Sequence, residues 1–94
     1  MKAKLDAPFC LTARCKPGQK RTDYWDTSVT GFVLECRSSG TSTFTFRYFD
    51  EYGRQRQRKI GNLGEITFAQ AQAIAKKWRA EVTMGGDPAT RKAD

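Results

Sequence analysis

The chain has 94 residues, a formal net charge of +7 and an isoelectric point near 9.7. This length allows one small domain, and the charge favours a polyanionic partner. The sequence has no apolar run of about 18 residues, so we expect no membrane span, and nucleic acid is then a commoner partner than an anionic membrane. Lys2, Lys4 and Asp6 interrupt any signal-peptide core, which favours a cytoplasmic protein.

The first 21 residues show no clear periodicity, and we expect a flexible basic segment there. Its most distinct part is the turn-rich run at residues 16–21, which carries Lys16, Lys20 and Arg21. Such a loop can follow a phosphate backbone, although a loop that is simply solvated is the commoner case. The folded domain is therefore expected to cover residues 22–86.

The three cysteines, Cys10, Cys15 and Cys36, have no paired-ligand spacing, and the chain contains no histidine. A zinc site would need a fourth ligand of another kind. We expect reduced packing thiols, as is usual in a cytoplasmic protein, with no metal and no cofactor.

Alternating residues indicate strands near residues 32–37, 43–49 and 54–60. Turn-forming residues at 38–41 and 50–53 join them as hairpins, and residues 24–27 are a candidate fourth strand. Phe44, Phe46 and Tyr48 share one face of the second strand, which makes it the most secure of the three. We also expect Trp25 to lie over the core.

The third strand is nearly all polar, so one of its faces must be exposed to solvent or contact a polar partner. Arg56 and Arg58 share parity with the apolar Ile60, and two explanations are open. Either the arginines extend past the edge of the core, or a bulge shifts the register.

A helix is predicted near residues 68–84, because Thr67 followed by Gln70 fits a capping box. An apolar stripe should pack on the aromatic face of the sheet, and it comprises Ala71, Ile74, Ala75, Trp78 and Val82. A glycine after Met84 should end the helix, and residues 87–94 should begin a linker. The fold class is thus α+β: a three-stranded, or four-stranded, antiparallel sheet packed against one C-terminal helix.

The sequence shows no catalytic constellation. It has no histidine, no clustered carboxylates and no glycine-rich phosphate loop that opens a helix. We therefore expect neither an enzyme nor a small-molecule substrate.

An ordered set of short motifs resembles the N-terminal arm-type DNA-binding domain of phage and genomic-island integrases of the tyrosine recombinase class. The match covers roughly residues 22–90. The motifs are Tyr24-Trp25-Asp26-Thr27, Gly31-Phe32, Ser39-Gly40, the strand from Phe44 to Tyr48, Gly53-Arg54-Gln55-Arg56, Ile60-Gly61, Thr67-Phe68-Ala69-Gln70-Ala71 and Gly86-Asp87-Pro88.

The resemblance implies sequence-specific binding to double-stranded DNA, with the sheet in the major groove of arm-type sites. Core-binding and catalytic domains would follow this chain in the whole integrase. The remainder of that protein, and other integrase protomers, would then be partners.

On this reading, the DNA-facing side of the sheet carries Glu35, Arg37, Thr45, Arg47, Gln55, Gln57 and Lys59. Arg47 is the candidate guanine contact, and Gln55 or Gln57 the candidate adenine contact, because these side chains match the acceptor and donor pairs of those bases. Phosphate contacts are expected from Lys16, Lys20, Arg21 and Arg54.

Two other classes of function stay open. The basic sheet could dock an acidic protein partner or add a strand at its edge. Binding of single-stranded or structured RNA would want exposed aromatic side chains, for which Phe49 is the one candidate in the second strand.

Overall fold

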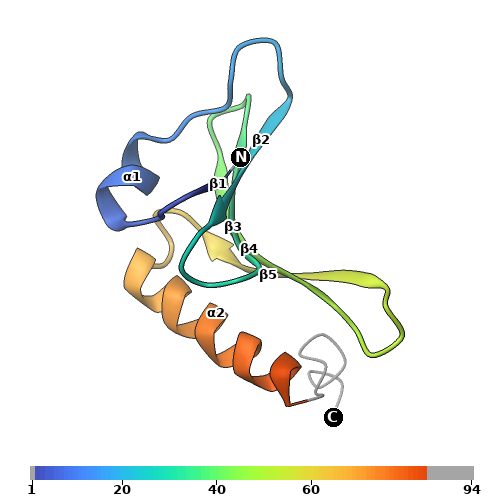
Figure 1. The fold of residues 1–94 in the computed structure, drawn as a ribbon. Helices are drawn as coiled ribbons and strands as arrows, with labels where there is room; N and C mark the ends of the chain where they lie inside the picture. The colour runs from blue at the N-terminus through green and yellow to red at the C-terminus, as the bar shows by residue number, and fades with distance from the viewer. Residues whose placement is uncertain (1, 85–94) are drawn as a thin grey trace.

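The computed structural model describes residues 2–84, which form one five-stranded sheet and two helices. The elements are β1 (Lys2–Ala3), α1 (Ala7–Thr12), β2 (Arg21–Asp26), β3 (Phe32–Arg37), β4 (Ser42–Phe49), β5 (Gln55–Asn62) and α2 (Phe68–Thr83). The strands follow each other across the sheet in chain order, and α2 lies against one face (Figure 1). The α+β class is confirmed. The expected three or four antiparallel strands are corrected to five in a mixed sheet, because β1 runs parallel to β2.

The folded domain includes the segment before residue 22, which corrects the boundary expected from the sequence. β1 pairs with Trp25 and Asp26, and Leu5 and Cys10 are buried in the core. Asp6 caps α1 by accepting a 2.8 Å hydrogen bond from the backbone N–H of Phe9. A two-residue strand and a six-residue helix are too short to show a periodic pattern, so sequence analysis does not detect them.

β3, β4 and β5 form the expected meander, within two residues of the predicted bounds. Their antiparallel pairing places Phe32, Phe44 and Phe46 on the face covered by α2, where each is fully buried. Burial of a phenylalanine side chain contributes about 1.5–3 kcal/mol, so these three rings supply a large part of the core. The ring of Phe68 in α2 packs on them, 5.9 Å from Phe32.

A β-bulge lies where β4 meets β5. Phe44 pairs with Gly61 and Thr45 pairs with Lys59, which leaves Ile60 as the extra residue in β5. Beyond the bulge, Arg58 stands opposite Phe46 on the α2 side of the sheet. Its guanidinium lies over the ring of Trp78, 4.5 Å from the centroid. Both explanations of the polar third strand therefore hold: the register shifts, and an arginine extends to the edge of the helix.

α2 begins with the predicted capping box. The backbone N–H of Gln70 donates to the hydroxyl of Thr67 at 3.1 Å, and the Gln70 side chain accepts from the Thr67 backbone at 3.0 Å. Ala71 and Ala75 are fully buried, as the apolar stripe predicts, and Trp78 and Val82 pack on the core. The predicted glycine cap and the linker at residues 87–94 lie outside the described residues. Between residues 2 and 84, neither helix is long and apolar enough to cross a membrane.

Candidate nucleic-acid interface

The sheet face away from α2, called the outer face here, carries every second residue of β2 to β5. The observed register confirms the alternation predicted for β3, β4 and β5. The outer face comprises Arg21, Asp23 and Trp25 of β2, Val33, Glu35 and Arg37 of β3, Thr43, Thr45, Arg47 and Phe49 of β4, and Gln55, Gln57 and Lys59 of β5. Its centre is unexpectedly covered, because Val33 and Thr45 are buried beneath longer neighbours.

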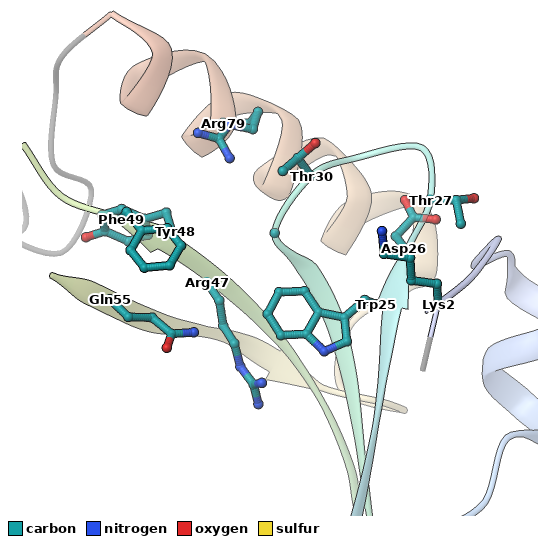
Figure 2. A pocket seen from close by; sticks show the side chains of 11 residues that line it. Lys2, Trp25, Asp26, Thr27, Thr30, Arg47, Tyr48, Phe49, Gln55 and Arg79 are labelled. Atoms are coloured by element: carbon teal, nitrogen blue, oxygen red, sulfur yellow. The ribbon is translucent and has the colours of Figure 1, made fainter. Parts of the chain in front are cut away.

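Arg47 is the main reason for this cover. Its side chain is 9% exposed, and its guanidinium binds two carboxylates, Asp23 Oδ2 through Nη1 at 3.0 Å and Glu35 Oε2 through Nη2 at 2.6 Å. The same group lies over the ring of Trp25, 5.1 Å from the centroid (Figure 2). Burial disfavours the charged form, but the hydrogen bonds that Arg47 donates to Glu35 and Asp23 outweigh it and raise the pKa of Arg47. The fork that would contact a guanine is thus engaged within the fold.

Two more arginines extend this network. Arg21 Nε binds Asp23 Oδ1 at 2.9 Å, and Arg37 Nη2 binds Glu35 Oε1 at 2.9 Å. Positive and negative side chains therefore alternate across β2, β3 and β4. The three arginines and two carboxylates of this network carry little net charge. This half of the outer face is nearly neutral, so the positive charge available to a ligand must come largely from elsewhere.

Beyond this network, the exposed cationic and amide side chains of the outer face lie on β5. Gln55, Gln57 and Lys59 are all exposed, and Lys59 stands directly opposite Thr45. Within residues 2–84, no side chain forms a hydrogen bond or ion pair with these three. Their donors and acceptors are therefore available to a ligand.

A recess of about 290 Å³ joins β5 to the arginine network. It is lined by three arginines and two glutamines, namely Arg21, Arg47, Gln55, Arg56 and Gln57. Twist brings these residues of β2, β4 and β5 together across the sheet. Among the described residues no carboxylate lines the recess, and a cluster of guanidinium and amide donors is the chemistry that binds a phosphate. All three arginines also form ion pairs within the fold, Arg56 with Asp50 at 3.8 Å, so a phosphate here would compete with those carboxylates. Four of the five residues were predicted DNA contacts.

Four other predicted contacts, Lys16, Lys20, Arg37 and Arg54, lie at the two ends of the sheet. Lys16 and Lys20 are exposed in the loop before β2 (Figure 1), and Arg37 pairs with Arg21 at that end of the sheet. Arg54 is at the opposite end, in the β4–β5 hairpin, where it binds Asp50 at 3.3 Å and lies over Tyr52. Thr45 is only 4% exposed, so its hydroxyl is not presented to a ligand.

Sequence reasoning missed Asp23 and Arg56. The alternation of Arg21, Asp23 and Trp25 carried the signal for Asp23, since it places all three on one face of a strand. Arg56 was assigned to the other face, opposite Tyr48, and its long side chain nevertheless reaches the recess. The expectation that Trp25 covers the core is corrected, because its partner Val33 places it on the outer face.

The described residues hold no group of three or more His, Cys, Asp or Glu side chains placed to bind a metal. All three cysteines are free thiols, with Cys10 and Cys36 buried. Burial, with help from Asp6 and other nearby acidic groups, raises the pKa of Cys10 to about 12. This thiol is a packing group rather than a nucleophile.

Comparison with known proteins identifies the class of domain to which this fold and this surface correspond. The chain belongs to the arm DNA-binding domain family, whose match extends over residues 2–94. It is similar to prophage integrase IntF of Escherichia coli (strain K12), with 34% identity over 77 residues. That match covers 81% of this chain but only 16% of the relative, so the chain spans a small part of the integrase's length.

Proposed function

We propose that the outer face binds double-stranded DNA at arm-type sites, as part of an integrase that performs site-specific recombination. The observation that carries the proposal is the recess of three arginines and two glutamines on a domain of the arm DNA-binding family. The net charge of +7 supports it, because a basic domain gains affinity for DNA by releasing counterions from phosphates.

Base contacts are assigned to β5, whose strand would lie along the major groove. Gln57 and Lys59 are exposed on the same face and are adjacent in its alternation, about 7 Å apart at two residues of a strand. The Gln57 amide can bind adenine through N6 and N7, and the Lys59 ammonium can donate to guanine acceptors. A guanine contact by Arg47 stays a prediction, and it would require both of its ion pairs to open.

Phosphate contacts are assigned to the recess and to the ends of the sheet. Lys16 and Lys20 at one end, and Arg54 at the other, would bind backbone on either side of the groove. These residues are exposed, so each should contribute affinity without sequence preference. Arg21, which lines the recess and is 47% exposed, belongs to the same group.

In the whole integrase, arm binding by such a domain would act by tethering. Holding one DNA site raises the effective concentration of the catalytic part at a second site. Other domains of the integrase would catalyse the reaction, and this chain would bind the DNA site that positions them.

The test is a titration of the 94-residue chain against fluorescent duplexes that tile the DNA flanking its own gene. About four phosphate contacts would weaken binding roughly a hundredfold between about 50 and 200 mM salt. We expect one short repeat to be preferred and its binding to have this salt dependence. Binding that is weak and indifferent to both sequence and salt would contradict the proposal.

A further inference from the structure

The sheet changes width where β3 begins. Phe32, the first residue of β3, pairs with Phe46, and the next residue of β4, Arg47, donates its N–H to Gly31 O at 2.8 Å. Beyond that point β4 continues beside β5 alone, with Tyr48 opposite Arg56. The sheet therefore narrows to two strands at this step.

A second cavity, of about 380 Å³, lies at the step (Figure 2). Its walls come from β4, from the loop between β2 and β3, from Trp25 on the outer face and from Arg79 on α2. This volume is near the lower limit of small-ligand pockets, roughly 300–1,000 Å³, so it admits one bulky side chain rather than a large surface. The cavity adjoins the proposed DNA-contact recess, with which it shares Arg47 and Gln55, and it extends from the end of β3 towards Arg79 of α2.

The step leaves part of a strand edge open. Alternate residues of an antiparallel strand direct their N–H groups to the same neighbour, so Phe49 points its N–H to the side on which Arg47 meets Gly31. In the part of the chain that the structure describes, no backbone hydrogen bond joins Phe49 to the loop at residues 27–31. An extended peptide could pair with this edge, as strands do when they add to a sheet.

The rim of the cavity is apolar. Phe49 is 65% exposed, which is unusual for a ring of this size, and Trp25 also lines the opening, whereas Tyr48 is only 3% exposed and adds little accessible surface. A side chain inserted between these rings would bury apolar surface that water now contacts. The cavity therefore suits an aromatic or large aliphatic side chain.

The charge available in the cavity is positive. Asp26 is the one carboxylate among the described residues of the lining, and it accepts backbone hydrogen bonds from Leu5 at 3.0 Å and from Val29 at 2.9 Å. Lys2 and Arg79 also line the cavity, and within residues 2–84 no carboxylate forms an ion pair with either. An occupant with carboxylates beside its apolar group would be complementary to this lining.

We propose that this cavity is a docking site for an extended acidic segment of a partner protein. The segment pairs with the backbone of Phe49, inserts one apolar side chain between Trp25 and Phe49, and places carboxylates beside Lys2 and Arg79. The open strand edge favours a peptide over a nucleotide, since it offers a backbone pairing pattern that only another polypeptide matches. Gln57 and Lys59, the base contacts proposed on β5, do not line this cavity, so the two proposals can be tested with different variants.

A random dodecapeptide phage library, panned on the 94-residue chain, supplies the probe. The enriched peptide is synthesised and titrated into the ¹⁵N-labelled chain. We expect enriched sequences with acidic residues around one bulky apolar residue, and NMR shifts centred on Gly31 and Phe49. Phe49→Ala and Arg79→Glu should each weaken peptide binding at least tenfold.

Matched controls change the same residue types outside the cavity. Tyr52→Ala and Lys76→Glu alter exposed side chains that do not line it, and we expect less than a twofold effect on peptide binding. Arg79→Glu should leave duplex binding unchanged, which separates this site from the proposed DNA interface. A chain that binds the peptide but no duplex would refute the DNA proposal alone.

Three results would overturn the docking site. The library could enrich no acidic consensus, or peptide binding could survive both Phe49→Ala and Arg79→Glu. A single-stranded oligothymidylate could also shift the Gly31 and Phe49 amides at lower concentration than the peptide, and the cavity would then be assigned to nucleic acid.

Discussion

Replacing Arg47 by methionine should destabilise the fold, because Arg47 neutralises two carboxylates on the outer face. Glu35 is 4% exposed at its side chain, and Arg47 contributes the shorter of its two ion pairs, 2.6 Å against 2.9 Å for Arg37. Removing one partner of a buried pair costs about 3–5 kcal/mol. Arg21 and Arg37 remain beside the carboxylates, so we expect a smaller loss of about 2–4 kcal/mol in the free energy of unfolding.

Urea denaturation followed by tryptophan fluorescence measures this loss directly. A change of this size in a domain of this length lowers Tm by roughly 10–25 °C. The double variant Arg47→Met/Glu35→Met should recover part of the stability, because it no longer leaves a carboxylate without its main cation. Arg54→Met is the matched control: Arg54 is 69% exposed, and its partner Asp50 keeps Arg56 and two backbone N–H donors, so the loss of Arg54 should cost less than about 1 kcal/mol.

The competing hypothesis is that Arg47 opens its ion pairs and contacts a guanine. It predicts that Arg47→Met keeps the stability of the parent chain within about 0.5 kcal/mol and loses preference at one base pair, at a cost of about 1–3 kcal/mol in binding. That outcome would refute the structural role assigned here to Arg47. Binding must be compared at a temperature at which both proteins are folded.

Three further predictions concern other parts of the fold. Gly31 has φ of +89°, and a Cβ there would lie 2.2 Å from a carbonyl oxygen of β4. Gly31→Ala should therefore lower the free energy of unfolding by well over the roughly 1–2 kcal/mol that a left-handed non-glycine residue costs. Gly40→Ala has open space around it, so denaturation curves should show only the roughly 1–2 kcal/mol of backbone strain. Iodoacetamide at neutral pH should modify Cys15 and spare Cys10, whose pKa burial raises to about 12, and equal labelling in the folded chain would contradict the packing. At Asp50, burial raises the pKa, but hairpin backbone N–H groups and a neighbouring arginine outweigh it and hold the pKa below its usual range. Its ionised form thus stabilises the hairpin above about pH 4, and this contribution disappears as pH falls through the lowered pKa, which an NMR titration of the carboxyl carbon will follow.

Long periodic segments made much of the fold predictable. The meander was specified by alternation and by turn residues, and α2 by its capping box and its apolar stripe, because both patterns repeat over enough residues to be distinct. α1 and β1 were not predictable in this way. Leu5 and Cys10 are buried through contacts with residues distant in the chain, which local sequence does not record.

Sequence analysis could predict which side chains lie on the outer face, but not which of them are held in ion pairs. Alternation correctly placed Arg47, Gln57 and Lys59 on the outer face. That Arg47 is engaged by Asp23 and Glu35 depends on the twist that brings β4 near β2, and no spacing in the sequence reports it. For the same reason, sequence reasoning chose Arg47 for base contact, whereas the exposed donors that have no partner among the described residues lie on β5.

A pair of charge reversals tests the central claim most directly. Lys59→Glu changes the middle of the outer face, and Lys76→Glu makes the same change on α2, where the side chain is also exposed. Both variants would be titrated with the preferred duplex at about 100 mM salt, a concentration at which phosphate contacts still contribute strongly. We expect at least a tenfold loss of affinity for Lys59→Glu and less than about a threefold loss for Lys76→Glu. Equal losses, or a larger loss for Lys76→Glu, would contradict binding through the outer face of the sheet.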